Sequence, residues 1–168
     1  MSTIRKSMFV IACLIGGTAG LFISLSEAQA ATATATIAVS ATITSLCTIT
    51  ALPLAFGAYT YALVAAQTTL TVTCTAASPY NVGLNLGLGT GATIALRQMT
   101  SLTSTLLGYN LYQDAAHATV WGPTIGTNTE TGTGTGLVQT LTVYGQIAAA
   151  EYSAPGVYTD TVTATITY

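Results

Sequence analysis

The chain has 168 residues, of which 51% are hydrophobic and only 5% are charged. So few positive charges cannot neutralise a run of phosphates, which excludes a nucleic-acid partner. So apolar a composition also excludes a disordered tail. With one histidine and a formal net charge of −2, little material remains for acid–base chemistry, so we expect no enzyme, no catalytic residue and no cofactor.

The first thirty residues are typical of an export signal. Arg5 and Lys6 are followed by an apolar run over residues 8–15 and by a small-residue cleavage pattern at 28–30. Cleavage after Ala30 would leave 168 − 30 = 138 residues with one arginine against four acids, a net charge of 1 − 4 = −3. Two alternatives remain: residues 8–25 could be an uncleaved anchor, and residues 10–13 resemble a lipidation box.

Two cysteines remain after such a cleavage, because Cys13 leaves with the signal. An even pair in an exported chain indicates a disulfide between Cys47 and Cys74, the alternative being two buried free thiols. Two cysteines and a single histidine cannot complete a zinc site, so no metal is expected.

Apolar and polar residues alternate along most of the remaining chain. From Ala31 to Ile43 the odd positions are apolar and the even positions are mostly threonine or serine, the pattern of a strand with one apolar face. Glycine, proline, serine and asparagine separate further runs of this kind. No convincing helical period is present, so the sequence predicts an antiparallel β-sandwich. The runs are residues 68–75, 80–88, 106–113, 118–121, 137–147 and 157–168.

Three local patterns could suggest chemistry, but each is better explained by structure. The TGTGTG tract at 131–136 lacks the lysine and the following helix of a phosphate loop, so we interpret it as a loop. Asp114 and His117 suggest a turn between strands rather than a catalytic pair. An aromatic set could stack on a sugar, although strand aromatics more often pack in a core. That set is Tyr109, Tyr112 and Trp121.

The two ends of the mature chain complement each other. The chain stops at the end of the predicted strand 157–168, which has no charge after Asp160 to protect an unpaired edge. A strand supplied from outside the domain would cover such an edge, and the alternating N-terminal segment is suited to do so in a neighbouring copy.

Four features together resemble the spore coat protein U domain family. They are Cys47 after an alternating N-terminal strand, YNLYQDA at 109–115, VYGQI at 143–147 and GVYTDT at 156–161. This family includes major subunits of archaic chaperone–usher pili, and the resemblance covers essentially the whole mature chain.

The resemblance implies an incomplete immunoglobulin-like antiparallel β-sandwich that lacks its last strand and is completed by donor-strand exchange. A periplasmic chaperone would lend a strand until an outer-membrane usher exchanges it for the N-terminal extension of the next subunit. The Cys47–Cys74 pair would match the family disulfide. The implied donor residues are Ala33, Ala35, Ile37, Val39 and Ala41, of which the first two are smaller than a tight grip would favour. The implied acceptor-groove and chaperone-contact residues are Val157, Val162, Ala164, Ile166 and Tyr168.

We therefore expect a signal peptide at 1–30, a donor extension at 31–42 and a pilin domain at 43–168. The expected function is a structural fimbrial subunit that polymerises head-to-tail at the cell surface, for attachment or biofilm formation. Two other interpretations stay open. One is a secreted β-sandwich adhesin or binding module, and the other is a small outer-membrane β-barrel, which alternating strands and the terminal Tyr168 also suit.

Overall fold

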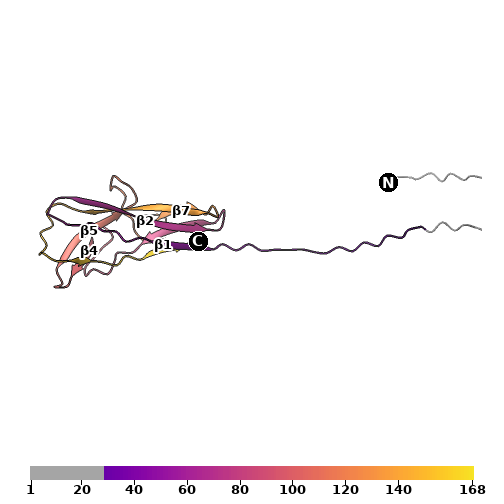
Figure 1. Ribbon diagram of the computed structural model, residues 1–168, viewed down its shortest axis with the longest axis horizontal. Helices are drawn as coiled ribbons and strands as arrows, with labels where there is room; N and C mark the ends of the chain where they lie inside the picture. Colours follow the sequence, from indigo (N-terminus) through magenta and orange to yellow (C-terminus); the bar gives the residue numbers. More distant parts are fainter. Residues whose placement is uncertain (1–28) are drawn as a thin grey trace, which may run out of the picture. The chain divides into compact units, whose positions relative to one another are not determined.

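The computed structural model describes residues 29–168, whose regular structure consists of strands alone (Figure 1). That part of the chain therefore contains no helix able to cross a membrane. The strands are β1 (Cys47–Ala51), β2 (Val64–Cys74), β3 (Pro79–Leu84), β4 (Arg97–Ser101), β5 (Leu106–Tyr112), β6 (Glu130–Thr133), β7 (Val138–Ile147), β8 (Tyr158–Thr159) and β9 (Ala164–Thr167).

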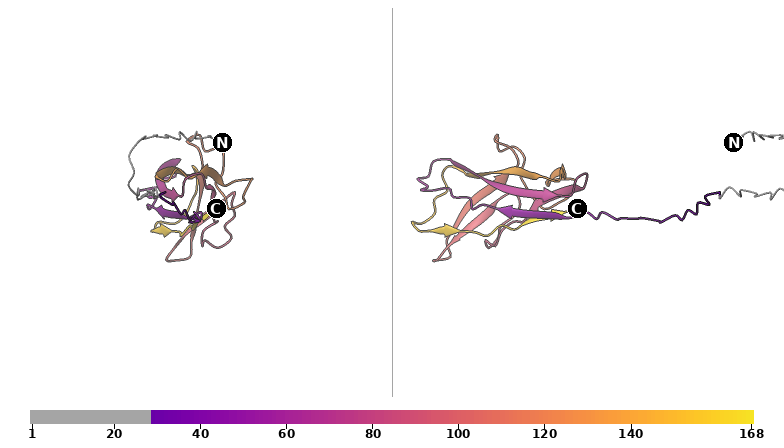
Figure 2. Two further views of the ribbon diagram at one scale, coloured as in Figure 1. Left: turned by 90° about the vertical axis from the view of Figure 1, so that its right-hand side faces the viewer. Right: turned by 45° about the vertical axis from the view of Figure 1, so that its right-hand side comes forward.

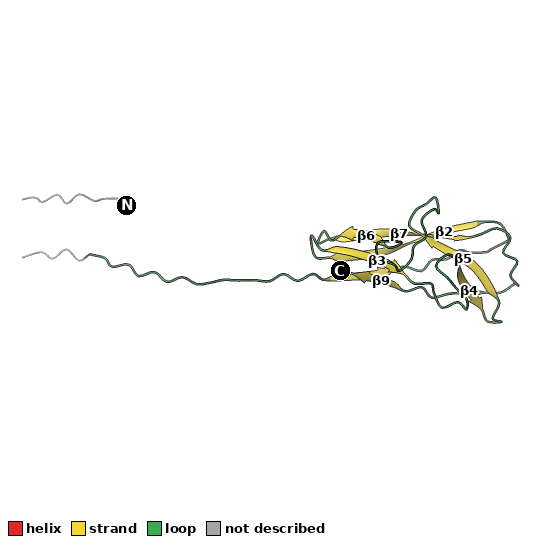
Figure 3. Cartoon of the chain, turned by 180° about the vertical axis from the view of Figure 1, so that it is seen from behind, coloured by secondary structure: helices red, strands yellow, loops and turns green. Residues whose placement is uncertain are grey.

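The strands form two antiparallel sheets. One has six strands in the order β1-β2-β7-β5-β4-β8, and the other has three in the order β6-β3-β9. Figure 3 shows β6, β3 and β9 side by side. The all-β, immunoglobulin-like architecture expected from the sequence is confirmed.

The hydrophobic core lies between the two sheets. Leu70, Val72 and Val143 contribute from the larger sheet, and Val82 and Leu84 from the smaller one. Along β2 the apolar positions at 70, 72 and 74 are buried while the threonines between them are partly exposed, as expected when successive side chains point to opposite faces.

Trp121 and Arg97 tie the two sheets together inside this core. The indole Nε1 of Trp121 donates a hydrogen bond to the Val82 carbonyl at 2.8 Å. The guanidinium of Arg97, which is fully buried, donates to Asn110 Oδ1 at 2.6 Å and to the Trp121 carbonyl at 2.6 Å. It also donates to two backbone carbonyls at the end of β3, those of residues 84 and 85. Burial lowers the pKa of Arg97, and the four acceptors offset the cost of removing its charge from water.

The disulfide expected between Cys47 and Cys74 is present. The two cysteines are direct partners in the register of β1 and β2. The bond therefore fastens the outermost strand of the larger sheet to its neighbour.

The body has two ends that matter below. We call the end at which β1 begins at Cys47 and β9 ends at Thr167 the tail end. We call the opposite end, where Ser101 pairs with Tyr158, the loop end.

Several predicted elements were correct and others were wrong. The runs at 68–75, 80–88, 106–113 and 137–147 correspond to β2, β3, β5 and β7. Residues 118–121 form only an isolated bridge between Val120 and Tyr112, and the tract at 131–136 begins inside β6 rather than being wholly loop. Strand β4 was missed because its inward residues are Arg97, Met99 and Ser101, of which only Met99 is apolar, so the strand lacks an apolar alternation.

Two more expectations about the ends need correction. Residues 157–168 form two short strands rather than one, because β8 pairs with β4 and β9 pairs with β3 in the other sheet. Residues 31–43 contain no strand, because a strand needs hydrogen-bonding partners that its alternating sequence cannot supply by itself. The predicted signal peptide lies outside the described residues, apart from 29 and 30.

Removing the disulfide should destabilise the edge strand β1. For the double variant Cys47→Ser/Cys74→Ser we expect a loss of about 2–5 kcal/mol in the free energy of unfolding, because the loop between the cysteines is no longer closed in the unfolded chain. Urea denaturation measures this loss, and the yield of exported protein should fall with it. Thr50→Ser, at an exposed position of the same strand that leaves the pair intact, is the matched control, and equal urea midpoints for all three proteins would contradict the assignment.

Arg97→Met should be among the most destabilising substitutions in the chain. It keeps most of the side-chain volume but removes the charged donor that serves four acceptors, of which Asn110 Oδ1 keeps a second donor in the Leu111 N–H, so we expect a loss of about 3–5 kcal/mol. Denaturation of the purified protein tests this expectation. The reference is Gln98→Met, a neighbouring partly exposed position on the same strand, which should cost much less.

Candidate functional site

The structure leaves one edge of each sheet unpaired at the same place. β1 is the last strand of the larger sheet and β9 is the last strand of the smaller one, and within the described residues neither has a partner on its outer side. The two strands lie next to each other, and Figure 2 shows β1 in purple along the same side of the body as the yellow C-terminal strands. Unpaired N–H and C=O groups of such edges readily accept another strand.

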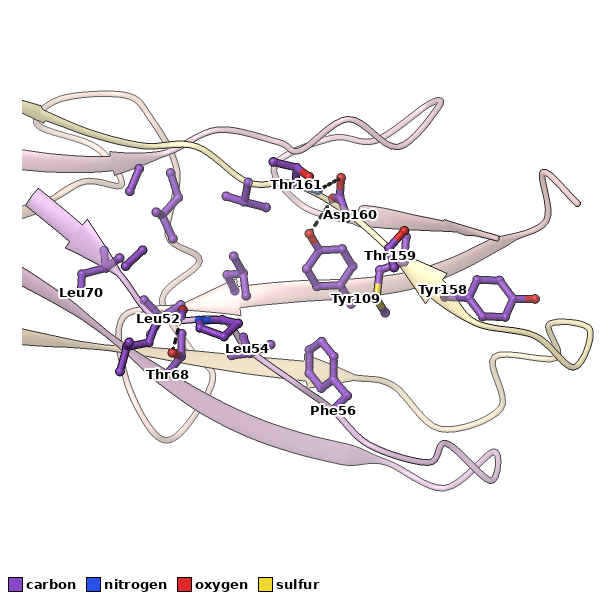
Figure 4. Close-up of a pocket in the computed structure, with 18 residues that line it drawn as sticks. Leu52, Leu54, Phe56, Thr68, Leu70, Tyr109, Tyr158, Thr159, Asp160 and Thr161 are labelled. Atoms are coloured by element: carbon purple, nitrogen blue, oxygen red, sulfur yellow. Dashed lines mark hydrogen bonds between the residues drawn. The ribbon is translucent and has the colours of Figure 1, made fainter. Parts of the chain in front are cut away.

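An apolar groove of about 450 Å³ begins where these two edges part, at Ala51 of β1 and Ala164 of β9. One wall is the segment that ends β1 and follows it, residues 51–54 with Phe56. The other wall is residues 158–162 with Ala164, which include β8 and the start of β9. Figure 4 shows the labelled side chains of both walls around the space. The floor consists of core side chains, among them Leu70, Leu84, Tyr109, Leu111 and Val143.

The groove closes toward the tail end and continues toward the loop end. Residues 47–50 and 166–168 do not line it, and β1 and β9 lie next to each other. In the other direction, a second hollow of about 720 Å³ shares Leu54, Phe56, Met99 and Tyr158 with the first. Its lining extends to Tyr61, so the trough widens and opens at the loop end.

The first wall depends on a close approach to β7. A Cβ atom on Gly145 would lie 2.9 Å from Phe56 Cζ and 3.0 Å from Leu54 Cδ2. Glycine at this position therefore lets both side chains lie flat against the sheet, which leaves the groove open above them.

The second wall is held in place by Asp160. Its carboxylate accepts hydrogen bonds from the Tyr109 hydroxyl at 2.6 Å and from the backbone N–H groups of Leu88 and Thr161, both at 2.7 Å (Figure 4 draws the bonds to Tyr109 and Thr161). Asn85 Oδ1 accepts a further bond from the Thr163 N–H at 2.9 Å. These bonds hold the segment that crosses from one sheet to the other and explain why residues 157–168 are not one continuous strand.

Tyr109 is both buried and tied to a carboxylate. Burial, and then the hydrogen bond to Asp160, raise the pKa of Tyr109 well above its ordinary value near 10. Because the folded-state pKa is the higher one, the contribution of this tyrosine to stability is complete below about pH 10 and is lost as the pH rises further.

Of the five predicted acceptor residues, two line the groove. Val162 and Ala164 belong to its second wall. Val157 lines only the second hollow and is exposed, while Ile166 packs against the core beyond the closed end of the groove. Tyr168 is half exposed at the tail end. The acceptor role of all five stays a prediction, and the structure offers no groove contact for Ile166 or Tyr168.

The first wall was missed by the sequence analysis. Leu52, Leu54 and Phe56 alternate with smaller residues after β1, and this short period-two pattern was the available signal. Asp160 was missed as well, since a charge in a predicted strand suggests only an exposed position.

The predicted donor residues carry their apolar side chains in solvent. Residues 29–46 form neither helix nor strand, which Figure 3 shows as green chain. Ile37 and Val39 are 87% and 89% exposed, and Ala33, Ala35 and Ala41 are exposed too. A row of exposed apolar side chains on an extended segment is costly in water, so it indicates a surface that another molecule covers.

The remaining candidate residues pack in the core or stabilise a turn. Trp121 and Tyr109 are buried in the core, and Tyr112 is partly buried, so they form no sugar-stacking platform. Asp114 caps the turn at 114–119, accepting hydrogen bonds from the Ala118 and Thr119 N–H groups, which lower its pKa. Among residues 29–168 no group of histidine, cysteine, aspartate or glutamate could hold a metal ion.

Tyr109→Phe should loosen the second wall and flatten the alkaline part of the stability profile. At neutral pH we expect a loss of about 1.5–3 kcal/mol, the usual value of a hydrogen bond to a charged group. Above pH 10 the wild type should lose stability faster than the variant, so the two curves converge. Urea denaturation at pH 7 to 11 measures both effects. If the stability curves of the two proteins stay parallel up to pH 11, the raised pKa of the Tyr109 hydroxyl is contradicted.

Comparison with known proteins identifies a family and a structural relative. The family model of the Spore Coat Protein U domain matches residues 33–165. Protein U of Myxococcus xanthus is 40% identical over 78 residues, which are 46% of this chain and 43% of Protein U.

The structural relative is part of a pilus assembly complex. It is a chain of the crystal structure of the CsuC–CsuE chaperone–tip adhesion subunit pre-assembly complex from archaic chaperone-usher Csu pili of Acinetobacter baumannii. The TM-score is 0.58 at 25% identity, over 76% of this chain and 41% of that chain. The chain thus spans less than half the length of either relative.

Proposed function

The chain belongs to the Spore Coat Protein U domain family, and from this premise we propose that it is a chaperone–usher pilus subunit that polymerises by donor-strand exchange. The N-terminal extension of one copy fills the groove between β1 and β9 of the next. The family and the fold are those of structural pilus subunits rather than enzymes.

One observation carries this proposal: the same chain has an uncovered apolar groove between two unpaired edges and an uncovered apolar strand sequence. The groove leaves apolar residues of its first wall in contact with solvent, since Leu52 is exposed and Leu54 and Phe56 are partly exposed. Ile37 and Val39 are almost fully exposed. Burying these two side chains contributes about 1.5–3 kcal/mol each, and backbone hydrogen bonds to the free edges fix the register.

The alternation of residues 31–41 suits insertion between the two sheets. The apolar odd positions face the floor of the groove, and the threonines and serine at even positions face solvent. Ile37 and Val39 occupy the wide part near Leu54 and Phe56, whereas the small Ala33 and Ala35 lie toward the closed end, where β1 and β9 meet.

This order of residues sets the direction of the inserted strand. Its N-terminal part lies toward the tail end of the acceptor and its C-terminal part leaves at the open loop end. The strand thus runs parallel to β1 and antiparallel to β9. Such a head-to-tail contact joins two different surfaces and does not close on itself, so it propagates a fibre.

The proposal includes the assembly partners and the location. A related chain is found in a chaperone–subunit complex, which supports a periplasmic chaperone that covers the same groove before polymerisation. An outer-membrane usher would then exchange the chaperone strand for the next subunit, and the fibre would stand at the cell surface and serve attachment or biofilm formation.

Single substitutions in the donor segment should have different effects on its apolar face and on its solvent-facing side. Ile37→Asp places a charge against the apolar groove floor, so we expect loss of fibres while the subunit still accumulates bound to its chaperone. Ala38→Asp, on the opposite face and one residue away, should leave fibre yield within about twofold, since its side chain stays in solvent. Electron microscopy of sheared cell-surface material and the amount of periplasmic subunit are the measurements.

Deletion of residues 31–40 is the stronger form of the same experiment. It should abolish fibres and leave the groove-forming domain intact and chaperone-bound. Normal fibres from this deletion would falsify the assignment of the donor segment, as would equal effects of Ile37→Asp and Ala38→Asp.

A further inference from the structure

Large exposed apolar side chains gather at the loop end of the body. Tyr152 is 83% exposed, and Tyr61, Val157 and Leu102 are also exposed. They lie together because Tyr61 and Val157 line the same hollow, and Leu102 follows Ser101, which pairs with Tyr158. We call Tyr61, Leu102, Tyr152 and Val157 the loop-end patch.

The two tyrosines of the loop-end patch pack against each other and against an anchored third tyrosine. The ring centroids of Tyr61 and Tyr152 are 5.4 Å apart, and Tyr59 packs edge-on against Tyr61 at 5.9 Å. The Tyr59 hydroxyl donates to the Ala148 carbonyl at 2.6 Å and accepts from the Glu151 N–H at 2.9 Å. Anchored aromatic side chains lose little conformational entropy on binding, which is why they are common in interfaces.

The backbone beneath this patch is strained. Tyr61 and Ala150 have φ values of 64° and 65°, and the Ala150 N–H donates to the Tyr61 carbonyl at 2.9 Å. Non-glycine residues rarely adopt such values, and strain of this kind concentrates at binding surfaces.

A second apolar patch lies at the tail end. Leu46, Leu137 and Val138 are exposed there, and Tyr168 is half exposed. They belong to one surface because Val138 pairs with Thr73, and the backbone N–H of Thr75 donates to the Leu46 carbonyl. No charged residue occurs at 43–51, 75–81, 132–140 or 163–168. We call Leu46, Leu137, Val138 and Tyr168 the tail-end patch.

The short linker brings the two patches of neighbouring subunits together. If Val39 lies in the groove, only residues 40–46 separate it from Cys47 of its own domain, and seven residues span at most about 25 Å. The linker leaves the groove where it opens, at the loop end of the acceptor. The tail end of the donor subunit must therefore lie within about 25 Å of that end.

We propose that the loop-end patch of one subunit packs against the tail-end patch of the subunit whose strand it has accepted. This inference rests on the donor-strand function proposed above and adds a second interface to it, whose partner is another copy of this chain. The inserted strand connects the subunits, and the patch contact sets the angle between them. The fibre is then an ordered stack rather than a flexible string of domains.

Charge substitutions at the two patches test this contact. In cells that express the full chain, Tyr152→Lys and Leu137→Glu should each leave fibres that are joined but irregular, with a persistence length reduced about tenfold, as expected when a central interface residue is lost. The double variant should restore the order, because every junction then pairs one lysine with one glutamate. Ile125→Lys is the matched control. Ile125 is 54% exposed but lies in the 122–128 loop, which is hydrogen-bonded to Leu84 in the middle of the body.

The outcomes separate this inference from the function on which it rests. Absence of fibres from the wild type would refute donor-strand polymerisation itself. Ordered fibres from Tyr152→Lys, or a double variant as irregular as the single ones, would overturn the patch contact alone. If fibres stay ordered while Tyr152→Lys loses binding to a glycan array, the patch binds carbohydrate and the proposed contact is wrong.

If the Tyr152→Lys variant does not accumulate, disulfide cross-linking provides a second test of the contact. In fibres of Tyr152→Cys/Leu137→Cys we expect covalent ladders in boiled, unreduced samples, about tenfold stronger than in fibres of Ile125→Cys/Leu137→Cys. Equal ladders in the two samples would contradict the contact.

Discussion

The incomplete space between β1 and β9 is the constraint on which the rest of the structure depends. Two sheets meet there without a strand to close them, so an apolar groove lies next to two unpaired rows of backbone groups. Neither can remain in water without cost, since edges invite pairing and exposed apolar surface invites burial. The exposed side chains of Ile37 and Val39 likewise need an apolar surface to cover them. The proposed polymerisation would meet both needs at once.

The groove is useful only if it stays open and keeps its shape. The disulfide holds β1 to β2 on one side. On the other side, Asp160 and Asn85 hold the crossing between β8 and β9. Beneath both, the buried guanidinium of Arg97 and the indole of Trp121 bridge the sheets. These polar contacts are directional, so they fix geometry where apolar packing alone would let the sheets collapse into the empty space. Such a frame would hold the incoming strand proposed above in one register.

The scarcity of charged residues suits both proposed interfaces for the same reason. Of the few charged residues in the described part of the chain, Arg97 is buried and Asp160 is bound within the groove wall. The tail end has none, and the loop end has only Glu151. Identical subunits stacked end to end would repeat any surface charge along the fibre, where like charges repel. An uncharged surface with packed aromatic side chains suits the proposed close stacking.

The sequence by itself determined the class of this protein. Period-two alternation specified strands, the even cysteine pair indicated the disulfide, and the matched ends suggested an exchange of strands, because these are local patterns or simple counts. It could not show that Arg97 points inward or that Leu54 and Phe56 form a wall, since both depend on what the opposite sheet supplies. Nor could it show that Asp160 divides the last strand. Residue 160 meets Tyr109 and Leu88 only after folding, so tertiary structure alone decided where the groove lies, which end opens and which apolar side chains remain uncovered.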